Sequence, residues 1–133
     1  MEVHSREVRN YLTEEGISPF EEWHTSLQDR QSRARIFARL AKLRLGNLGD
    51  YKIVGDNLLE LREHYGPGLR LYCGQIGKEI VILLCGGDKK SQNQDIKTAS
   101  EYWKNYLRRE RENREKESTP KIPQQKRRKN RKR

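Results

Sequence analysis

The sequence predicts an α+β domain in which a helical hairpin packs against a small antiparallel sheet. Three observations lead to this prediction. Two amphipathic helical stretches follow one another between residues 18 and 46, three short strand-like stretches separated by glycine turns lie between residues 57 and 85, and a last helical stretch runs from residue 91 to residue 107. With a first strand over residues 6–12, the expected order is β-α-α-β-β-β-α.

The first two elements are a strand and a capped helix. Val8, Asn10 and Leu12 alternate on one face of the strand expected over residues 6–12. Ser18 then begins a capping box, Ser18-Pro19-Phe20-Glu21, with proline at the first helical position. The apolar stripe of this helix follows at helical spacing: Phe20, Trp23, His24 and Leu27.

A second helix follows almost without a loop. Asp29 can cap its start and Gly46 can end it. Its expected apolar side consists of Ile36, Phe37, Leu40 and Leu43. Residues 46–56 contain three glycines and are expected to form a loop.

Three strands are expected over residues 57–65, 69–76 and 79–85, with turns at Gly66-Pro67-Gly68 and Gly77-Lys78. A first turn symmetric about Pro67 places Arg62 opposite Tyr72 and His64 opposite Arg70. The second turn places Cys73 opposite Ile82, so no disulfide with Cys85 is expected. The last helix carries Ile96, Ala99, Trp103 and Leu107 on one face.

The hairpin alternation predicts a cluster of polar side chains on one sheet face. Arg62, His64, Arg70 and Tyr72 share that face, while the leucines between them face the core, and Lys89 and Lys90 arrive just after the third strand. Arginines can clamp phosphate oxygens, a histidine can transfer a proton, and a tyrosine can stack on a base. The same alternation is also typical of a sheet face that is simply solvated.

Charge is concentrated at the C-terminal end. The 133 residues include 29 Lys or Arg and 19 Asp or Glu, a net charge of +10, and residues 108–133 alone hold 13 basic and 4 acidic residues, a net charge of +9. We therefore expect a domain over residues 1–107 and a disordered basic tail over residues 108–133. Lys126, Arg127 and Arg128 lie in a run that would bind polyanions with a steep salt dependence; a merely solubilising extension is the alternative.

The second predicted helix is also basic. Arg35, Arg39 and Lys42 lie at i, i+4 and i+7, along one side. This side could be an electrostatic footprint for RNA or the ribosome. It could equally be the solvated back of an amphipathic helix.

Several classes of protein are not expected. The longest apolar run, residues 80–85, is far shorter than the roughly 20 residues of a membrane-spanning helix, and the first residues lack the apolar stretch of a signal peptide. Two cysteines do not make a disulfide scaffold, which favours a reduced cytoplasmic location. No glycine-rich phosphate loop and no metal-ligand spacing is present, so any catalysis is expected to need neither cofactor nor metal.

Five segments together resemble a known family. The chain is similar to the addiction module killer proteins, a branch of the RelE/ParE (HigB-like) toxins of bacterial type II toxin–antitoxin systems. The resemblance covers roughly residues 5–105. It rests on Asp29-Arg30-Gln31-Ser32-Arg33-Ala34-Arg35-Ile36, Leu45-Gly46-Asn47-Leu48-Gly49-Asp50, Glu60-Leu61-Arg62, Tyr65-Gly66-Pro67-Gly68-Leu69-Arg70-Leu71-Tyr72 and Ile82-Leu83-Leu84-Cys85-Gly86-Gly87-Asp88-Lys89.

This resemblance implies a fold, partners and an activity. The fold would be RelE-like, a helical hairpin on a small curved antiparallel sheet, and a cognate antitoxin, usually a helix-turn-helix protein, would neutralise the chain. The activity would be ribosome-dependent, metal-independent cleavage of mRNA, which inhibits translation. Two alternatives stay open: a ParE-like inhibitor of DNA gyrase without nuclease activity, and a non-enzymatic protein that binds RNA or the ribosome through its basic tail.

The resemblance also assigns roles to individual residues. Arg70 matches the arginine that the ribonucleases use on the phosphate, Arg62 matches a basic position of the preceding strand, and Lys89 or Lys90 falls near a second catalytic arginine. Two positions depart from the family pattern. Glu60 stands where the family has lysines, and residues 91–95 lack its tyrosine or histidine, which leaves His64 as the substitute for moving a proton.

Overall fold

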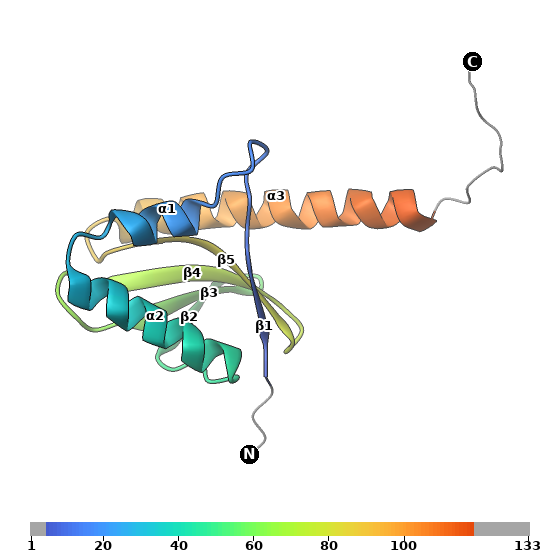
Figure 1. The fold of residues 1–133 in the computed structure, drawn as a ribbon. Helices are drawn as coiled ribbons and strands as arrows, with labels where there is room; N and C mark the ends of the chain where they lie inside the picture. The colour runs from blue at the N-terminus through green and yellow to red at the C-terminus, as the bar shows by residue number, and fades with distance from the viewer. Residues whose placement is uncertain (1–4, 119–133) are drawn as a thin grey trace.

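The glycine-punctuated stretch between residues 51 and 87 folds into four consecutive antiparallel strands. In the computed structural model, which describes residues 5–118, these are β2 (Tyr51–Gly55), β3 (Leu58–Glu63), β4 (Leu69–Ile76) and β5 (Ile80–Gly87). The first strand, β1 (Glu7–Asn10), pairs in parallel with β5. The result is a mixed α+β fold with an open five-stranded sheet in the order β1-β5-β4-β3-β2 (Figure 1).

Strand β2 corrects the expectation of a loop over residues 46–56. Only the first part of that stretch is a loop, and residues 51–55 pair with β3 as an edge strand. The tight turn that joins β2 to β3 contains Asn57, whose φ of 53° is a left-handed conformation that asparagine tolerates. Gly55 therefore marks the end of a strand, next to a register shift, and does not mark a loop.

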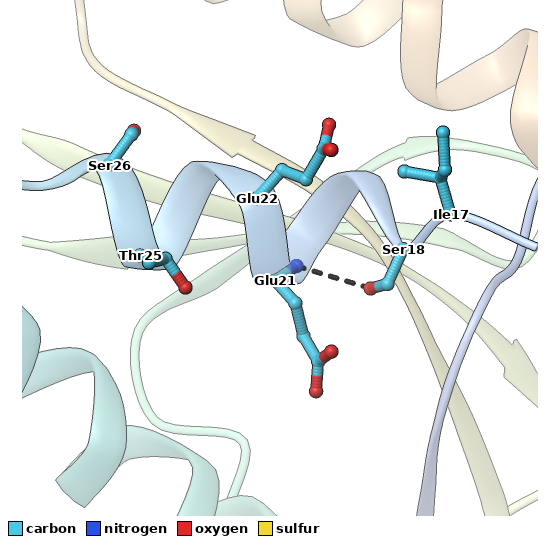
Figure 2. Close-up of a pocket in the computed structure, with 6 residues that line it drawn as sticks. All are labelled: Ile17, Ser18, Glu21, Glu22, Thr25 and Ser26. Atoms are coloured by element: carbon cyan, nitrogen blue, oxygen red, sulfur yellow. Dashed lines mark hydrogen bonds between the residues drawn. The ribbon is translucent and has the colours of Figure 1, made fainter.

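The helical hairpin forms as expected from its caps. Helix α1 (Pro19–Ser26) begins where Ser18 Oγ accepts a hydrogen bond from the Glu21 amide at 3.1 Å (Figure 2). Helix α2 (Arg30–Arg44) begins at Asp29, whose carboxylate accepts from the Gln31 amide at 3.3 Å. These capping hydrogen bonds confirm both predicted helix starts.

Helix α3 (Gln92–Ser118) is longer than expected and projects beyond the sheet (Figure 1). The predicted disorder from residue 108 is therefore wrong for residues 108–118, and residues 119–133 lie outside the described part of the chain. Beyond the sheet, burial no longer stabilises the helix. There, residues with a high helix propensity and ion pairs such as Arg108–Glu112, 3.2 Å apart, stabilise it instead. Among residues 5–118, no helix has the length and apolar character to cross a membrane.

Both faces of the sheet are covered. Helices α1 and α2 pack on one face, where the leucines of the β3–β4 hairpin form a core as expected: Leu59, Leu61, Leu69 and Leu71. Helix α3 packs on the other face, over Leu58, Tyr72, Ile82 and Leu84. It comes so close that a Cβ atom on Gly74 would lie 2.3 Å from the ring of Trp103. The polar side of the hairpin is therefore largely enclosed and is not a solvated face.

The buried stripe of α2 differs from the expected one at two positions. Phe37, expected in the core, is 68 % exposed. Arg39 is buried in the stripe with Ile36, Leu40 and Leu43. The difference arises because the loop after α2 folds back over Arg39 and offers it hydrogen-bond acceptors.

The strand registers also differ from those expected. Arg62 lies opposite Arg70, and Glu60 lies opposite Tyr72, because the hairpin loop is centred on Gly66 and not on Pro67. Gly66 and Gly68 both have left-handed φ angles, 57° and 81°, which make this wider loop possible.

The β4–β5 turn is centred on Lys78 and not between Gly77 and Lys78, so Cys73 lies opposite Leu83 instead of Ile82. A bulge between Tyr72 and Cys73 then shifts the pairing once more. The prediction that the two cysteines form no disulfide is confirmed. Cys73 and Cys85 are free thiols in the cores on opposite faces of the sheet.

Candidate functional site

Two surface hollows of the molecule differ in their charge. The one beside α1 is lined by Ile17, by the carboxylates of Glu21 and Glu22 and by three hydroxyl side chains, and no basic side chain lines it (Figure 2). The one at the β3–β4 loop has a volume of about 390 Å³ and is lined by Arg62, Glu63, His64, Tyr65, Gly66, Pro67, Gly68, Leu69, Arg70 and Lys89. We call it the hairpin groove. It brings together most of the side chains that the sequence predicts to act on a phosphate.

Arg62 and Arg70 meet in the groove from neighbouring strands. They are a directly opposed pair of β3 and β4, so their side chains leave the sheet on the same face. Both approach the carboxylate of Glu60: Arg62 Nε donates to Oε1 at 2.9 Å, and Arg70 Nε lies 3.6 Å from Oε2. Arg70 Nη1 also donates to the Gly68 carbonyl at 2.9 Å, which ties the guanidinium to the loop.

Glu60 is a fully buried carboxylate beneath the two arginines. Besides Arg62, it accepts hydrogen bonds from Tyr72 Oη at 3.0 Å and from Gln92 Nε2, in the first turn of α3, at 2.8 Å. Burial raises the pKa of Glu60, but the hydrogen bonds from Gln92, Arg62 and Tyr72 and the charge of Arg62 outweigh it, so the net pKa lies below its usual value. The carboxylate is therefore charged at neutral pH.

The two lysines after β5 have different places. Lys89 lines the hairpin groove, and its amide donates to the Pro67 carbonyl at 3.3 Å. Lys90 is exposed and is not among the residues that line the groove. Its amide donates to Asp88 Oδ1 at 2.9 Å in the turn that leads into α3. The structure thus favours Lys89 over Lys90 as the lysine of the site.

His64 lies at the rim of the groove and not opposite Arg70. Its side chain is 73 % exposed, and Nε2 lies 2.5 Å from Asp50 Oδ2. A carboxylate on one ring nitrogen fixes the orientation of the ring and the tautomer. Asp50 was not among the predicted site residues, and only the folding of the loop after α2 brings it here.

A third hollow, of about 450 Å³, adjoins the hairpin groove, and we call it the helix groove. It is lined by Arg35, Ala38, Arg39, Lys42, Asn47, Gly49, Asp50, Arg62, Glu63 and His64. Arg62, Glu63 and His64 line both grooves, so the two form one continuous surface. Arg35 lies 4.3 Å over the ring of Tyr65, and Lys42 is exposed.

Arg39 requires a correction, because it is buried and not part of an exposed basic side. Only 7 % of its side chain is exposed. Its guanidinium donates to the carbonyls of Arg62, Leu48 and Asp50 at 2.6, 2.8 and 2.6 Å and to Glu63 at 3.0 Å. These bonds join α2, the following loop and β3, so Arg39 supports the walls of both grooves from within.

Tyr72 also requires a correction. Its ring is fully buried beneath α3, so it is not available to stack on a base. Burial and the hydrogen bond to Glu60 raise its pKa, which keeps the hydroxyl protonated as a donor. The aromatic residue that lines the hairpin groove is Tyr65, which the resemblance segment contained but to which no role had been assigned.

The predicted RNA-binding residues Lys126, Arg127 and Arg128 lie outside the described residues. Within residues 5–118, no three His, Cys, Asp or Glu side chains gather in a way that could hold a metal ion. The polar side chains that line the hairpin groove are those of two arginines, a lysine, a histidine and a tyrosine, together with the carboxylate of Glu63.

The family of the chain follows from a comparison with known proteins. No protein-family model matches the sequence. A protein of Haemophilus influenzae (strain ATCC 51907 / DSM 11121 / KW20 / Rd), described as an uncharacterized protein, is 45 % identical over 80 residues, which make up 60 % of this chain and 81 % of that protein. The chain belongs to the family of this protein. That description names no activity.

Proposed function

We propose that the chain is the toxin of a type II toxin–antitoxin system, a RelE/ParE-like (HigB-like) protein that cleaves mRNA on the ribosome without a metal ion. A cognate antitoxin, of the helix-turn-helix type, would neutralise it in the cytoplasm. The helical hairpin on one face of an antiparallel meander is consistent with a RelE-like fold. The resemblance segments support the assignment to the toxin family, and the side chains that line the hairpin groove support the proposed chemistry.

One observation carries the proposal: two opposed arginines, both close to the buried carboxylate of Glu60, share one groove with a lysine. Arg62, Arg70 and Lys89 are positive and Glu60 is negative, so the cluster keeps a net positive charge. A phosphodiester carries one negative charge, and its charge increases when an oxygen attacks the phosphorus. Positive groups fixed around that phosphorus therefore stabilise the transition state more than the ground state.

The proposed reaction is an internal transesterification of RNA. The 2′-oxygen loses its proton and forms a bond to the adjacent phosphorus, while the bond from phosphorus to the 5′-oxygen breaks. The products are a 2′,3′-cyclic phosphate and a 5′-hydroxyl that gains a proton. Arg62 and Arg70 would hold the non-bridging oxygens, and Lys89 would stabilise charge on the leaving oxygen.

A proton must leave the 2′-hydroxyl and another must reach the 5′-oxygen. His64 lines the groove, and its ring is oriented by Asp50, so it can serve as the group that moves a proton. Arg35 and Lys42 would hold neighbouring phosphates of the RNA along the helix groove. Lys126, Arg127 and Arg128 would add electrostatic affinity for ribosomal RNA.

The test is to map transcript ends in cells shortly after the full chain is induced. We expect new 5′ ends confined to translated reading frames, lost in Lys89→Ala and Arg70→Ala and kept in Lys78→Ala, which removes an exposed lysine from the distant β4–β5 turn. Lys89 is exposed, so its replacement tests the groove with little risk to folding.

Other outcomes would contradict the proposal. Growth arrest with intact transcripts would refute the nuclease and would favour inhibition of gyrase, measured as loss of supercoiling activity. A chain lacking residues 119–133 should still cut the same reading frames. If that deletion abolished every effect while the domain stayed folded, a protein that binds RNA through its tail would be the better explanation.

A further inference from the structure

A buried carboxylate between two leucines of β3 needs a physical explanation. Placing a charged carboxylate in the interior is costly unless it is fully hydrogen-bonded. Both oxygens of Glu60 have donors, and these come from three elements: Arg62 on its own strand, Tyr72 on β4 and Gln92 on α3. Glu60 thus joins the sheet, the last helix and the groove at one point.

We infer that Glu60 is a positioning residue that fixes the guanidinium groups of Arg62 and Arg70 toward the hairpin groove. The kinetic consequence of this inference rests on the proposed function, whereas its structural consequence does not. Glu60 itself is fully buried and is not among the residues that line the hairpin groove. It acts through the two arginines.

The geometry of Arg62 supports the inference. An arginine side chain has many rotamers, and ordering it costs conformational entropy. Among the described residues, the Arg62 guanidinium donates to Glu60 alone, through Nε. The bond therefore selects one orientation in the folded protein before any ligand binds, and it leaves both terminal nitrogens of Arg62 for a phosphate.

The geometry of Arg70 adds a second point. Arg70 Nε is buried and lacks a hydrogen-bond partner, and it lies 3.6 Å from Glu60 Oε2. A shift of about half an ångström would bring this pair into hydrogen-bonding distance. Charge attraction to Glu60 and the bond to the Gly68 carbonyl hold the guanidinium from two sides, so Arg70 reaches the groove in a restricted orientation.

The test uses Glu60→Gln in the full chain, which keeps the size of the side chain and removes its charge. Glu79→Gln is the matched control, because it removes the same charge from an exposed residue of the β4–β5 turn. Substrate cleavage is measured on programmed ribosomes under single-turnover conditions. Binding of each variant to programmed ribosomes is measured with an mRNA that carries a 2′-deoxy nucleotide at the cleavage position. This mRNA cannot react because it lacks the attacking 2′-hydroxyl.

Positioning predicts that rate and binding respond differently. In Glu60→Gln the cleavage rate should fall about 10- to 100-fold, as is typical when a group that orients a reacting residue is lost. Binding of the unreactive mRNA should stay equal or become tighter, because the groove gains net positive charge. Glu79→Gln should match the wild type in both. A wild-type rate in Glu60→Gln, or parallel losses of rate and binding, would overturn the inference.

A spectroscopic arm separates this inference from the proposed function. Hydrogen exchange of the Arg62 Nε–H, followed by nuclear magnetic resonance on the full chain, should be slow in the wild type and in Glu79→Gln and at least about tenfold faster in Glu60→Gln. If the wild type cleaves no RNA, the proposed function fails, and this exchange rate still decides whether Glu60 holds Arg62. Equal exchange rates in all three proteins would overturn the inference.

A second variant covers a failure of Glu60→Gln to fold. Tyr72→Phe removes one hydrogen bond to Glu60 and keeps the buried ring. We expect a cleavage rate several-fold below that of the wild type with unchanged binding, because Glu60 keeps its charge and loses part of its anchoring. Wild-type kinetics and wild-type exchange of the Arg62 Nε–H in Tyr72→Phe would then overturn the inference.

Discussion

Replacing Arg39 with methionine should destabilise the protein far more than replacing Arg35, one turn earlier on the same helix. Arg39 donates four hydrogen bonds, three of them to carbonyls of the loop after α2 and of β3. Methionine retains most of the volume but leaves those carbonyls and Glu63 without their donor. Arg35, by contrast, has a side chain that is 46 % exposed and lies 3.7 Å from Glu63.

The expected magnitude follows from these contacts. Removing one partner from a buried, charge-assisted network costs about 3–5 kcal/mol, whereas losing an exposed ion pair costs less than about 1 kcal/mol. At roughly 4 °C per kcal/mol for a domain of this size, Arg39→Met should lower the melting temperature by roughly 15 °C. Such a loss is a large fraction of the total stability of about 5–15 kcal/mol of an ordinary domain.

The assay is equilibrium unfolding in urea, followed by the fluorescence of Trp23 and Trp103, which pack on opposite faces of the sheet. Arg35→Met serves as the control. If Arg39→Met lost less than about 1 kcal/mol, the conclusion that Arg39 supports the groove walls would be refuted. That result would favour the role in an exposed RNA-binding side of α2 that the sequence suggested for Arg39.

Three further predictions concern packing, pH and thiol chemistry. Gly74→Ala should cost about 1–3 kcal/mol in a urea titration, because the new Cβ would lie 2.3 Å from the ring of Trp103. Glu60 has a folded-state pKa below its usual value of 4.5, so the stability it contributes is full above that pH and is lost as the pH falls through the folded pKa. Melting temperatures between pH 6 and pH 3 should therefore fall less steeply in Glu60→Gln than in the wild type. Burial raises the pKa of Cys73 and of Cys85 to about 12, so neither should react with an aromatic disulfide reagent at pH 8 until urea unfolds the chain.

Much of the fold was predictable because its signals are local. The Ser18 and Asp29 caps act within one helical turn, and the glycines at residues 66, 68 and 77 mark turns through their left-handed backbone. The edge strand β2 was missed because its side chains are mostly exposed and glycines flank it. The end of α3 was missed because alternating Arg and Glu residues are typical both of disorder and of a solvated helix.

The candidate site was predictable in composition and not in arrangement. Side-chain alternation placed Arg62 and Arg70 on one face, but the register that makes them direct neighbours depends on the width of the Gly66–Gly68 loop. In the sequence, Glu60 stands out only as a departure from the family pattern. Its burial depends on α3 lying over β3 and β4, and no spacing within β3 specifies that contact. Its alternation with Arg62 was the one local signal that could have identified it.

The parallel pairing of β1 with β5 has a consequence for the order in which the chain is made. Glu7 lies opposite Ile80, so the first strand to leave the ribosome has no partner until the last strand follows it. Lys89, which lines the hairpin groove, and Gln92, which bonds to Glu60, are synthesised shortly after β5. Because distant pairings form late, a nascent chain completes the edge of its sheet and the lining of its groove together. A chain terminated before residue 80 has neither.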